Sequence, residues 1–218
     1  MPTPSDHPAV PRPAPGRPKD LAKRAAILDA AQRMFLEHGF EGVSMDQIAA
    51  GAGVSKLTVY SHFGDKDTLF AAAVENYCEQ QVPPSLFTPS PGTPLRPRLI
   101  GIARAVHALM ISPEALAGFR LVCGSARVDP RLSRMFWDAG AGHLQAGFAA
   151  LLARRTATGE LDVADTGRAA SQFFALLRGE LHPRLMMGCG DMPGFDVDAH
   201  LEATVDLFLR AFAPRPGP

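Results

Sequence analysis

Cysteine is scarce in this chain of 218 residues, and its three cysteines, Cys78, Cys123 and Cys189, lie far apart. No two of them have the close spacing of a zinc site or a redox motif, and the seven histidines do not recur at four-residue helical intervals. The sequence therefore gives no support for a disulfide framework, a metal ion or another cofactor, and we expect none. Scattered thiols without an N-terminal targeting segment favour the reducing cytoplasm.

Net charge is also absent, because 22 basic residues balance 22 acidic ones. A protein that holds DNA by charge alone would carry an excess of basic residues, so the positions of the charges matter more than their sum. The chain uses arginine far more than lysine, and its lysines all lie in the first third: Lys19, Lys23, Lys56 and Lys66. A lysine carries a compact positive charge on a flexible side chain, so this placement indicates that such charges are used in the first third of the chain.

Alternating strand patterns are missing too, whereas apolar residues recur at three- and four-residue steps along the chain. Because 46% of the residues are hydrophobic, they can form a substantial core, and we expect an all-α fold. Cap residues, glycines and prolines set the expected boundaries. We expect helices from near Lys19 to Gly39, from Ser44 to about Gly51, from Ser55 onward, from Asp65 to about Gln81, and at about 94–111, 113–127, 130–157, 165–188 and 197–212.

The stretch from Ala25 to Phe70 carries the clearest local signals. Ser44, followed by Gln47 at the third helical position, predicts a capping box at the start of a short helix. Gly53 then fits a tight turn, and Ser55 is placed to cap the next helix. A short helix, a glycine-containing turn and another short helix form the helix-turn-helix pattern, in which the second helix enters the major groove of DNA.

In this second helix Val59 is expected to face inward with Val54 and Phe63, which leaves a polar outer face. The first residues of a recognition helix meet base edges, and Leu57 could touch a thymine methyl group. Side chains farther along suit phosphates, which fix register without reading sequence. An ordinary solvated helix in an all-helical core is the alternative. The candidates for DNA contact are Ser44, Ser55, Lys56, Leu57, Thr58, Tyr60, Ser61, His62 and Lys66.

This stretch resembles the tetracycline-repressor (TetR) family of one-component bacterial transcription regulators. The resemblance covers roughly Lys19 to Val74 and is most specific at Gly53-Val54-Ser55-Lys56, Val59-Tyr60, His62-Phe63, and Lys66 with Leu69-Phe70. It implies that Ser44, Tyr60 and Lys66 grip phosphates and that Lys56 to Ser61 approach bases. Leu57 departs from the smaller residue that is commoner at its position, which leaves open what it reads there.

Two proline-rich segments set the expected domain limits. Residues 1–18 are expected to form a disordered arm, and five basic residues against one acidic residue over 10–24 would let it reach a minor groove or a phosphate, or act as a solubilising tail. Residues 83–93 are expected to form a linker, with Thr93 capping the helix that follows. The expected units are therefore a DNA-binding domain with a connecting fourth helix at 19–82 and a larger helical effector-binding and dimerisation domain at 94–213.

Within the second unit, the part from Phe119 to Gly188 looks similar to the AefR-like C-terminal type, and in the family the second unit encloses a small-molecule pocket. Gly140 and Gly142 in mid-helix cost about 1 kcal/mol each against alanine, which points to a kink or to room for something bulky. Aromatic residues at helical spacing can be plain core or can line such a pocket. The pocket candidates are His107, Met110, Phe119, Arg120, Cys123, Phe136, Trp137, His143, Phe148 and Phe174.

The last two helices have apolar residues on two sides, and helix-turn-helix proteins read DNA in pairs. We therefore expect a homodimer in which these helices form a four-helix bundle. The residue Gly179 fits either a point of close helix approach or packing within one chain. The interface candidates are Gly179, Leu201, Val205, Phe208 and Phe212.

The expected function is a ligand-responsive transcription regulator, most readily a repressor, that binds a palindromic double-stranded operator as a homodimer and is released by a small apolar or aromatic effector. It needs no membrane. A nucleoid-type architectural protein with the same fold and no effector is one alternative, and a helical enzyme is another. We do not expect an enzyme, since no nucleophile, acid–base pair or metal set has a recognisable spacing, and Glu180 and His182 would point different ways on a helix.

Overall fold

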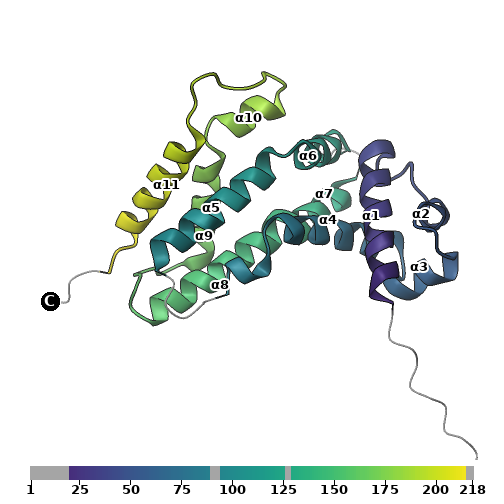
Figure 1. The fold of residues 1–218 in the computed structure, drawn as a ribbon, viewed down its shortest axis with the longest axis horizontal. Helices are drawn as coiled ribbons and strands as arrows, with labels where there is room; N and C mark the ends of the chain where they lie inside the picture. The colour runs from purple at the N-terminus through teal and green to yellow at the C-terminus, as the bar shows by residue number, and fades with distance from the viewer. Residues whose placement is uncertain (1–19, 89–93, 126–128, 215–218) are drawn as a thin grey trace, which may run out of the picture.

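The computed structural model describes residues 20–88, 94–125 and 129–214, and every regular element in these ranges is helical, as the sequence predicts. Figure 1 shows an elongated molecule with α1, α2 and α3 at one end and α11 at the other. The elements are α1 (Leu21–His38), α2 (Met45–Gly51), α3 (Lys56–Phe63), α4 (Lys66–Gln81), the 3₁₀ turn η1 (Pro84–Leu86), α5 (Leu95–Ile111), α6 (Pro113–Ser125), α7 (Pro130–Trp137), the π turn η2 (Asp138–Gly142), α8 (His143–Ala157), α9 (Thr166–Arg178), α10 (Leu181–Met186) and α11 (Val197–Ala211).

The N-terminal end, formed by α1, α2, α3 and the first half of α4, has its own hydrophobic core. Val59 of α3 is fully buried in this core, as expected. The rings of Phe35, Phe40 and Phe70 contact one another with centroids 5.3 to 5.7 Å apart. Because each buried aromatic or aliphatic side chain contributes about 1.5 to 3 kcal/mol, this small core holds α3 against α2 and α4.

The remaining helices form a second core around α5, α8, α9 and α11. Phe148 lies at its centre, fully buried, with its ring centroid 4.8 Å from that of Phe173 and 5.6 Å from that of Phe174. Phe208 of α11 lies against the same group, 4.9 Å from Phe173. Phe148 is therefore packed among aromatic side chains of its own chain.

Helix α4 belongs to both cores. Its first half contributes Ala73 to the N-terminal core, its second half contributes Cys78 to the other, and Val74 packs against both. Figure 1 shows α4 leaving the N-terminal end and running alongside α7 and α8. A displacement of α4 would therefore be felt at both ends of the molecule.

The first part of the predicted linker after α4 packs against the second core. Phe87 is buried, and its ring lies 6.4 Å from that of Phe148. The guanidinium of Arg98 donates to the carbonyl oxygens of Leu86 and Thr88, so this part of the segment is held against the second core. Residues 1–19, Thr93 and Arg127 lie outside the described residues, and so do the predicted arm and the predicted Thr93 cap.

Two long helices expected from the sequence are interrupted. The stretch from Pro130 to Ala157 contains the π turn η2, which includes both Gly140 and Gly142. A Cβ on Gly140 would lie 3.4 Å from Cγ1 of Val74, so this glycine lets the turn approach α4 closely. The stretch from 165 to 188 breaks at Gly179, which ends α9 with a positive φ of 51°. The predicted kink is therefore present, whereas the predicted unbroken helix to Gly188 is wrong.

In the described ranges no single helix is long and apolar enough to span a membrane. Only α5 and α6 taken together meet that length and composition, and these two helices are bent by 58° at the break between them.

Candidate DNA-binding surface and ligand cavity

The helix-turn-helix is fixed by two N-caps that the sequence predicts. Oγ of Ser44 accepts a hydrogen bond from the Gln47 amide at 3.2 Å, and Oε1 of Gln47 accepts one from the Ser44 amide at 2.8 Å, which completes the capping box. Oγ of Ser55 accepts from the Thr58 amide at 3.1 Å. Each cap satisfies amides that the first helical turn leaves without partners, so α2 and α3 begin at defined residues.

The outer face of α3 carries the predicted DNA-contact residues. Leu57 is 79% exposed and Tyr60 is 42% exposed, while Lys56 and Ser61 are also exposed and His62 is half-buried. An apolar side chain that is so exposed gains by transfer into a groove. The short helix therefore presents leucine, hydroxyl, phenol and amine groups on one accessible surface.

Lys56 already has a partner on α2. Its ammonium lies 2.9 Å from a carboxylate oxygen of Asp46, and this hydrogen bond raises the pKa of Lys56. The same ammonium lies 5.8 Å from the centre of the Tyr60 ring. Because the pair is exposed, it contributes little stability, and Lys56 can exchange Asp46 for a phosphate or a base at small cost.

Lys66 occupies a different environment from the one expected. Its ammonium donates hydrogen bonds to the carbonyl oxygens of Phe40 at 3.0 Å and Val43 at 3.2 Å, and it lies 4.2 Å from the centre of the Phe40 ring. Glu41 adds an ion pair at 3.9 Å. Lys66 therefore holds the loop between α1 and α2, and a contact between this residue and phosphate stays a prediction.

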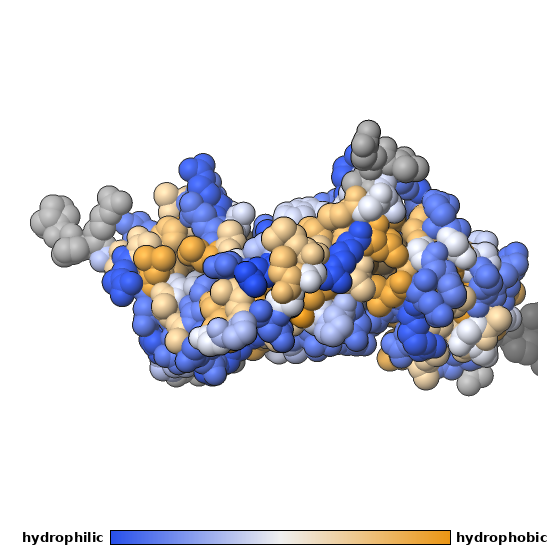
Figure 2. All heavy atoms as spheres, turned by 90° about the horizontal axis from the view of Figure 1, so that it is seen from above, coloured by the Kyte–Doolittle hydropathy of each residue, from blue (hydrophilic) through white to orange (hydrophobic). Residues whose placement is uncertain are grey.

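A large cavity lies between the N-terminal end and the second core. It is bordered by α1, α4, α5, α6, α7, η2, α8, α9 and α10, and its empty volume is about 1250 Å³, part of which is open to solvent. Its wall is mostly apolar. Trp137 and Phe119, which both line it, remain 45% and 38% exposed, and Figure 2 shows hydrophobic residues gathered over the middle of the molecule.

Half of the predicted pocket residues line this cavity, namely Met110, Phe119, Phe136, Trp137 and Phe174. The other half do not.

His107 is buried behind the wall, and burial lowers its pKa. Arg120 donates to the carbonyl oxygens of Leu185 and Met186 at the end of α10, and Cys123 is exposed. His143 lies between two glutamates of α4. Phe148 belongs to the second core. Helical periodicity identifies aromatic positions but does not say which side of the helix meets a void.

Six polar residues in the cavity wall are not among the predicted pocket residues, namely Gln32, Tyr77, Glu114, Gln145, Arg178 and His182. Tyr77 shares a hydrogen bond with Ser112 at 3.0 Å, and burial raises its pKa. Arg178 has no hydrogen bond or ion pair to any residue that the structure describes. Beside it, burial and the Arg178 charge lower the pKa of His182. One part of an otherwise apolar cavity therefore offers a guanidinium without a carboxylate partner.

The residues predicted to form a dimer interface point into their own chain. Leu201, Val205 and Phe208 are at most 2% exposed and lie in the core of their own chain. Phe212 packs on Phe208 with ring centroids 4.7 Å apart. Gly179 ends α9, and a Cβ there would meet the His200 ring at 3.0 Å, which is packing within one chain.

A different face of α9 and α11 is open. Leu176 is 40% exposed and Leu207 is 47% exposed, and their exposed neighbours include Ala175 and Ala203. These small and apolar side chains have no covering element in the described chain. The two helices therefore have a buried apolar side and an exposed one, and the predicted interface residues Leu201, Val205 and Phe208 lie on the buried side.

Comparison with known proteins matches both parts of the chain. Residues 27–73 match the family model described as bacterial regulatory proteins, tetR family, and residues 97–214, more than half of the chain, match the C-terminal domain of AefR-like transcriptional repressors. Two curated relatives are the HTH-type transcriptional repressor AcnR of Corynebacterium efficiens, 41% identical over 54 residues, and Rv1474c of Mycobacterium tuberculosis, 30% identical over 113 residues. The matches cover 25% and 52% of this chain and 29% and 56% of those relatives.

Solved structures match over nearly the whole fold. A TetR-family regulator from Mesorhizobium loti is 30% identical with a TM-score of 0.71, and the match covers 90% of this chain and 99% of that one. The flavonoid-responsive regulator FrrA is 32% identical with a TM-score of 0.69, covering 90% and 100%. With a helix-turn-helix at one end, a helical second domain and these matches, the chain belongs to the tetR family of bacterial transcriptional regulators.

Proposed function

We propose that the chain is a ligand-responsive repressor that binds a palindromic DNA operator as a homodimer and leaves it when a small effector enters the cavity. The observation that carries this proposal is the composition of the cavity wall. Phe35 of α1 and Phe70 of α4 belong to the core that holds α3, and both also line the cavity. A ligand that pushes on this wall acts directly on the core that positions the DNA-contact residues.

The exposed face of α3 supports DNA binding. Leu57, Thr58 and Lys56 lie in its first turn, where a recognition helix reads base edges, while Tyr60 and His62 are placed for phosphates. Ser44 and Ser55 contribute at the helix starts, where free amides and the helix dipole attract phosphate oxygens. These groups read a half-site of DNA.

The open face of α9 and α11 supports dimer formation. Leu176 and Leu207 with Ala175 and Ala203 form an apolar surface with small residues, which lets two helix pairs approach closely. A two-fold dimer reads two half-sites when its two α3 helices lie about 34 Å apart, one turn of DNA. A palindromic operator has the same symmetry.

The cavity supports an effector that is mostly apolar and carries one acidic or phenolic group. Its aromatic wall suits a flat ring system, and Arg178 offers charge-assisted hydrogen bonds to an oxygen of the ligand. The similarity to a flavonoid-responsive regulator agrees with this chemistry, because flavonoids are flat polyphenols. To regulate, the effector must favour the DNA-free state by about 1 to 3 kcal/mol.

The test is a fluorescence-anisotropy titration with the DNA beside the gene and with a scrambled duplex, each at two salt concentrations. We expect tight, salt-sensitive binding to the first duplex alone, since each neutralised phosphate releases counterions. Adding a flavonoid should then weaken binding about 5- to 150-fold. Equal binding to both duplexes, unaffected by aromatic acids or flavonoids, would instead identify an architectural protein.

Two arginines of α9 provide a matched pair of variants. Arg178→Met removes the cationic group of the cavity, and we expect the effector to bind about tenfold or more weakly, since a charged hydrogen bond contributes about 1.5 to 3 kcal/mol. Arg168→Met removes a side chain that is 75% exposed and, among the residues that the structure describes, is paired only with Asp165, and it should leave the response unchanged. An equal loss in both variants would contradict the cavity assignment.

A further inference from the structure

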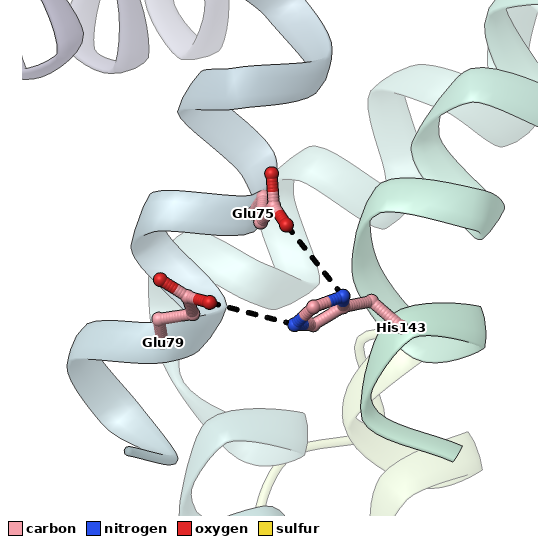
Figure 3. A group of neighbouring side chains, drawn as sticks. All are labelled: Glu75, Glu79 and His143. Atoms are coloured by element: carbon pink, nitrogen blue, oxygen red, sulfur yellow. Dashed lines mark ion pairs between the residues drawn. The ribbon is translucent and has the colours of Figure 1, made fainter. Parts of the chain in front are cut away.

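Three potential metal ligands converge on the surface between α4 and α8. Glu75 and Glu79 lie one turn apart on α4, and His143 is the first residue of α8, directly after the π turn. Figure 3 shows the two carboxylates and the imidazole directed toward one another. One oxygen of each glutamate and a ring nitrogen of the histidine all lie within 4.8 Å of one another.

The separations in this Glu75–Glu79–His143 cluster are unlike those of a hydrogen-bonded group. Nδ1 of His143 lies 3.6 Å from Oε1 of Glu75, and Nε2 lies 3.5 Å from Oε1 of Glu79. An N–H···O hydrogen bond is about 2.7 to 3.2 Å long. These two distances involve different ring nitrogens, and a single ion binds one of them. One ring nitrogen and one oxygen of each glutamate lie within 4.8 Å of one another. Two donors that share a metal through bonds of about 2.1 Å lie roughly 3.0 to 3.4 Å apart, so rotations of the three side chains would bring these atoms around one ion.

The cluster is accessible and its donor atoms are free for binding. The side chains of Glu75, Glu79 and His143 are 47%, 41% and 39% exposed. Within the described residues none of the three makes a hydrogen bond, and their ion pairs are with one another. Among the described residues, an incoming ion would therefore have to replace only the ion pairs inside the cluster.

A surface hollow borders the cluster and leaves room for further ligands of an ion. Glu79 and His143 line this hollow together with Phe87 and Arg154, and its empty volume of about 710 Å³ includes open solvent. The guanidinium of Arg154 donates to the carbonyl oxygen of Phe87, so its hydrogen bonding is directed away from the carboxylates. Three protein ligands with open positions for water are the arrangement of an accessible metal site.

The donor set selects the class of ion. One imidazole nitrogen and two carboxylate oxygens suit divalent first-row ions and not the soft ions that require thiolates. Cys78, the sequence neighbour of Glu79, is buried in the second core and offers no ligand atom at the surface.

We propose that Glu75, Glu79 and His143 form a binding site for a divalent first-row transition-metal ion such as Zn²⁺, Mn²⁺ or Co²⁺. The ion joins α4 to the start of α8 and fixes their separation beside the π turn. The bound ion would also restrain α4, the helix that connects the DNA-binding end to the cavity. Any effect of this restraint on DNA binding rests on the proposed function. Binding of the ion itself does not depend on that function.

The test is a titration of the full chain, free of any polyhistidine tag, with Co²⁺, whose visible absorption reports nitrogen and oxygen ligands. We expect a saturable absorption band and a higher thermal unfolding temperature with the ion. His143→Ala should weaken binding at least about tenfold, since even the partners behind metal ligands contribute 10- to 100-fold. The matched control His38→Ala removes a histidine of α1 that pairs with Glu37 at 3.8 Å, and it should change nothing.

Glu79→Gln is a second test of the site that separates loss of a ligand from misfolding, because it keeps the size of the side chain and removes only the charge. It should also weaken Co²⁺ binding at least about tenfold, while unfolding without metal stays as in the unaltered protein. The proposal is overturned if no band appears, or if His143→Ala and Glu79→Gln both bind Co²⁺ like the unaltered chain. A chain that binds Co²⁺ but no DNA would refute the proposed function and leave the metal site intact.

Discussion

Replacing Gly179 by alanine should destabilise the protein more than the same change at other glycines with positive φ. Gly179 ends α9 with φ 51° and ψ −152°, a backbone region that residues with a Cβ rarely adopt. A Cβ at this position would also lie 3.0 Å from Cε1 and Nε2 of His200. The ring would have to move away from the Leu177 carbonyl, which lies 3.4 Å from Nε2.

The magnitude follows from these two effects. Backbone strain of this kind costs about 1 to 3 kcal/mol, and loss of a neutral hydrogen bond costs about 0.5 to 1.5 kcal/mol. We therefore expect Gly179→Ala to lower the free energy of unfolding by about 2 to 4 kcal/mol. The loss of stability should be greatest at the corner between α9 and α10, next to Arg178 and His182 of the cavity.

Two other glycines separate strain from crowding. Gly188 has φ 76° and open space around its Cβ position, so Gly188→Ala should cost about 1 to 2 kcal/mol from backbone strain alone. Gly101 lies inside α5, also with open space, so Gly101→Ala should stabilise by about 0.5 to 1 kcal/mol.

The assay is equilibrium unfolding in urea at one protein concentration, because dimer formation would make stability depend on concentration. Repeating Gly179→Ala in a His200→Ala background measures the crowding term as a double-mutant cycle. There, the cost should fall to the backbone strain of Gly179 alone, about 1 to 3 kcal/mol. If Gly179→Ala costs no more than Gly188→Ala in either background, the argument from the His200 contact is wrong.

Three further changes test the caps, the open face and the buried histidines. Ser44→Ala should lower stability by about 1 kcal/mol in urea unfolding, because it removes the capping box; an unchanged midpoint would contradict the role of the cap. Leu207→Glu places a charge on the open face and should give monomers in light scattering, whereas Leu57→Glu on α3 should keep the assembly; dimers in both variants would exclude this face. Burial lowers the folded-state pKa of His107 and of His182, so the unfolded chain takes up these protons first and stability should fall as pH drops below about 6.5. A pH series of unfolding midpoints measures this fall, and His107→Gln should flatten it.

Helix starts were predictable because capping is local. A capping serine or aspartate and the backbone amide to which it bonds lie within four residues of each other. Caps occur at four of the expected helix starts, namely Ser44, Ser55, Asp65 and Asp165. Helix interruptions were less predictable, since glycine in a helix is tolerated. At Gly179 the ring of His200, which is distant in sequence, lies where a Cβ would be, and helical spacing does not reveal this contact.

The candidate sites were predictable only in part for a similar reason. The exposed face of α3 follows from the period of one helix. The cavity needs many helices to be placed in space, and two of its polar groups, Arg178 and His182, lie on either side of the unexpected break. The Glu75–Glu79–His143 cluster joins two helices that are far apart along the chain, so a search for regularly spaced histidines passes over it.

The shared position of α4 limits how such proteins can be recombined. Its first half packs with the DNA-binding end and its second half with the other core, and Val74 contacts both. A chimaera that exchanges DNA-binding domains at the proline-rich segment would import a foreign Tyr77 and Cys78 into this core. A junction near Val74 keeps each half of the helix with the residues against which it packs, so the natural unit of exchange ends inside a helix and not at the loop that follows it.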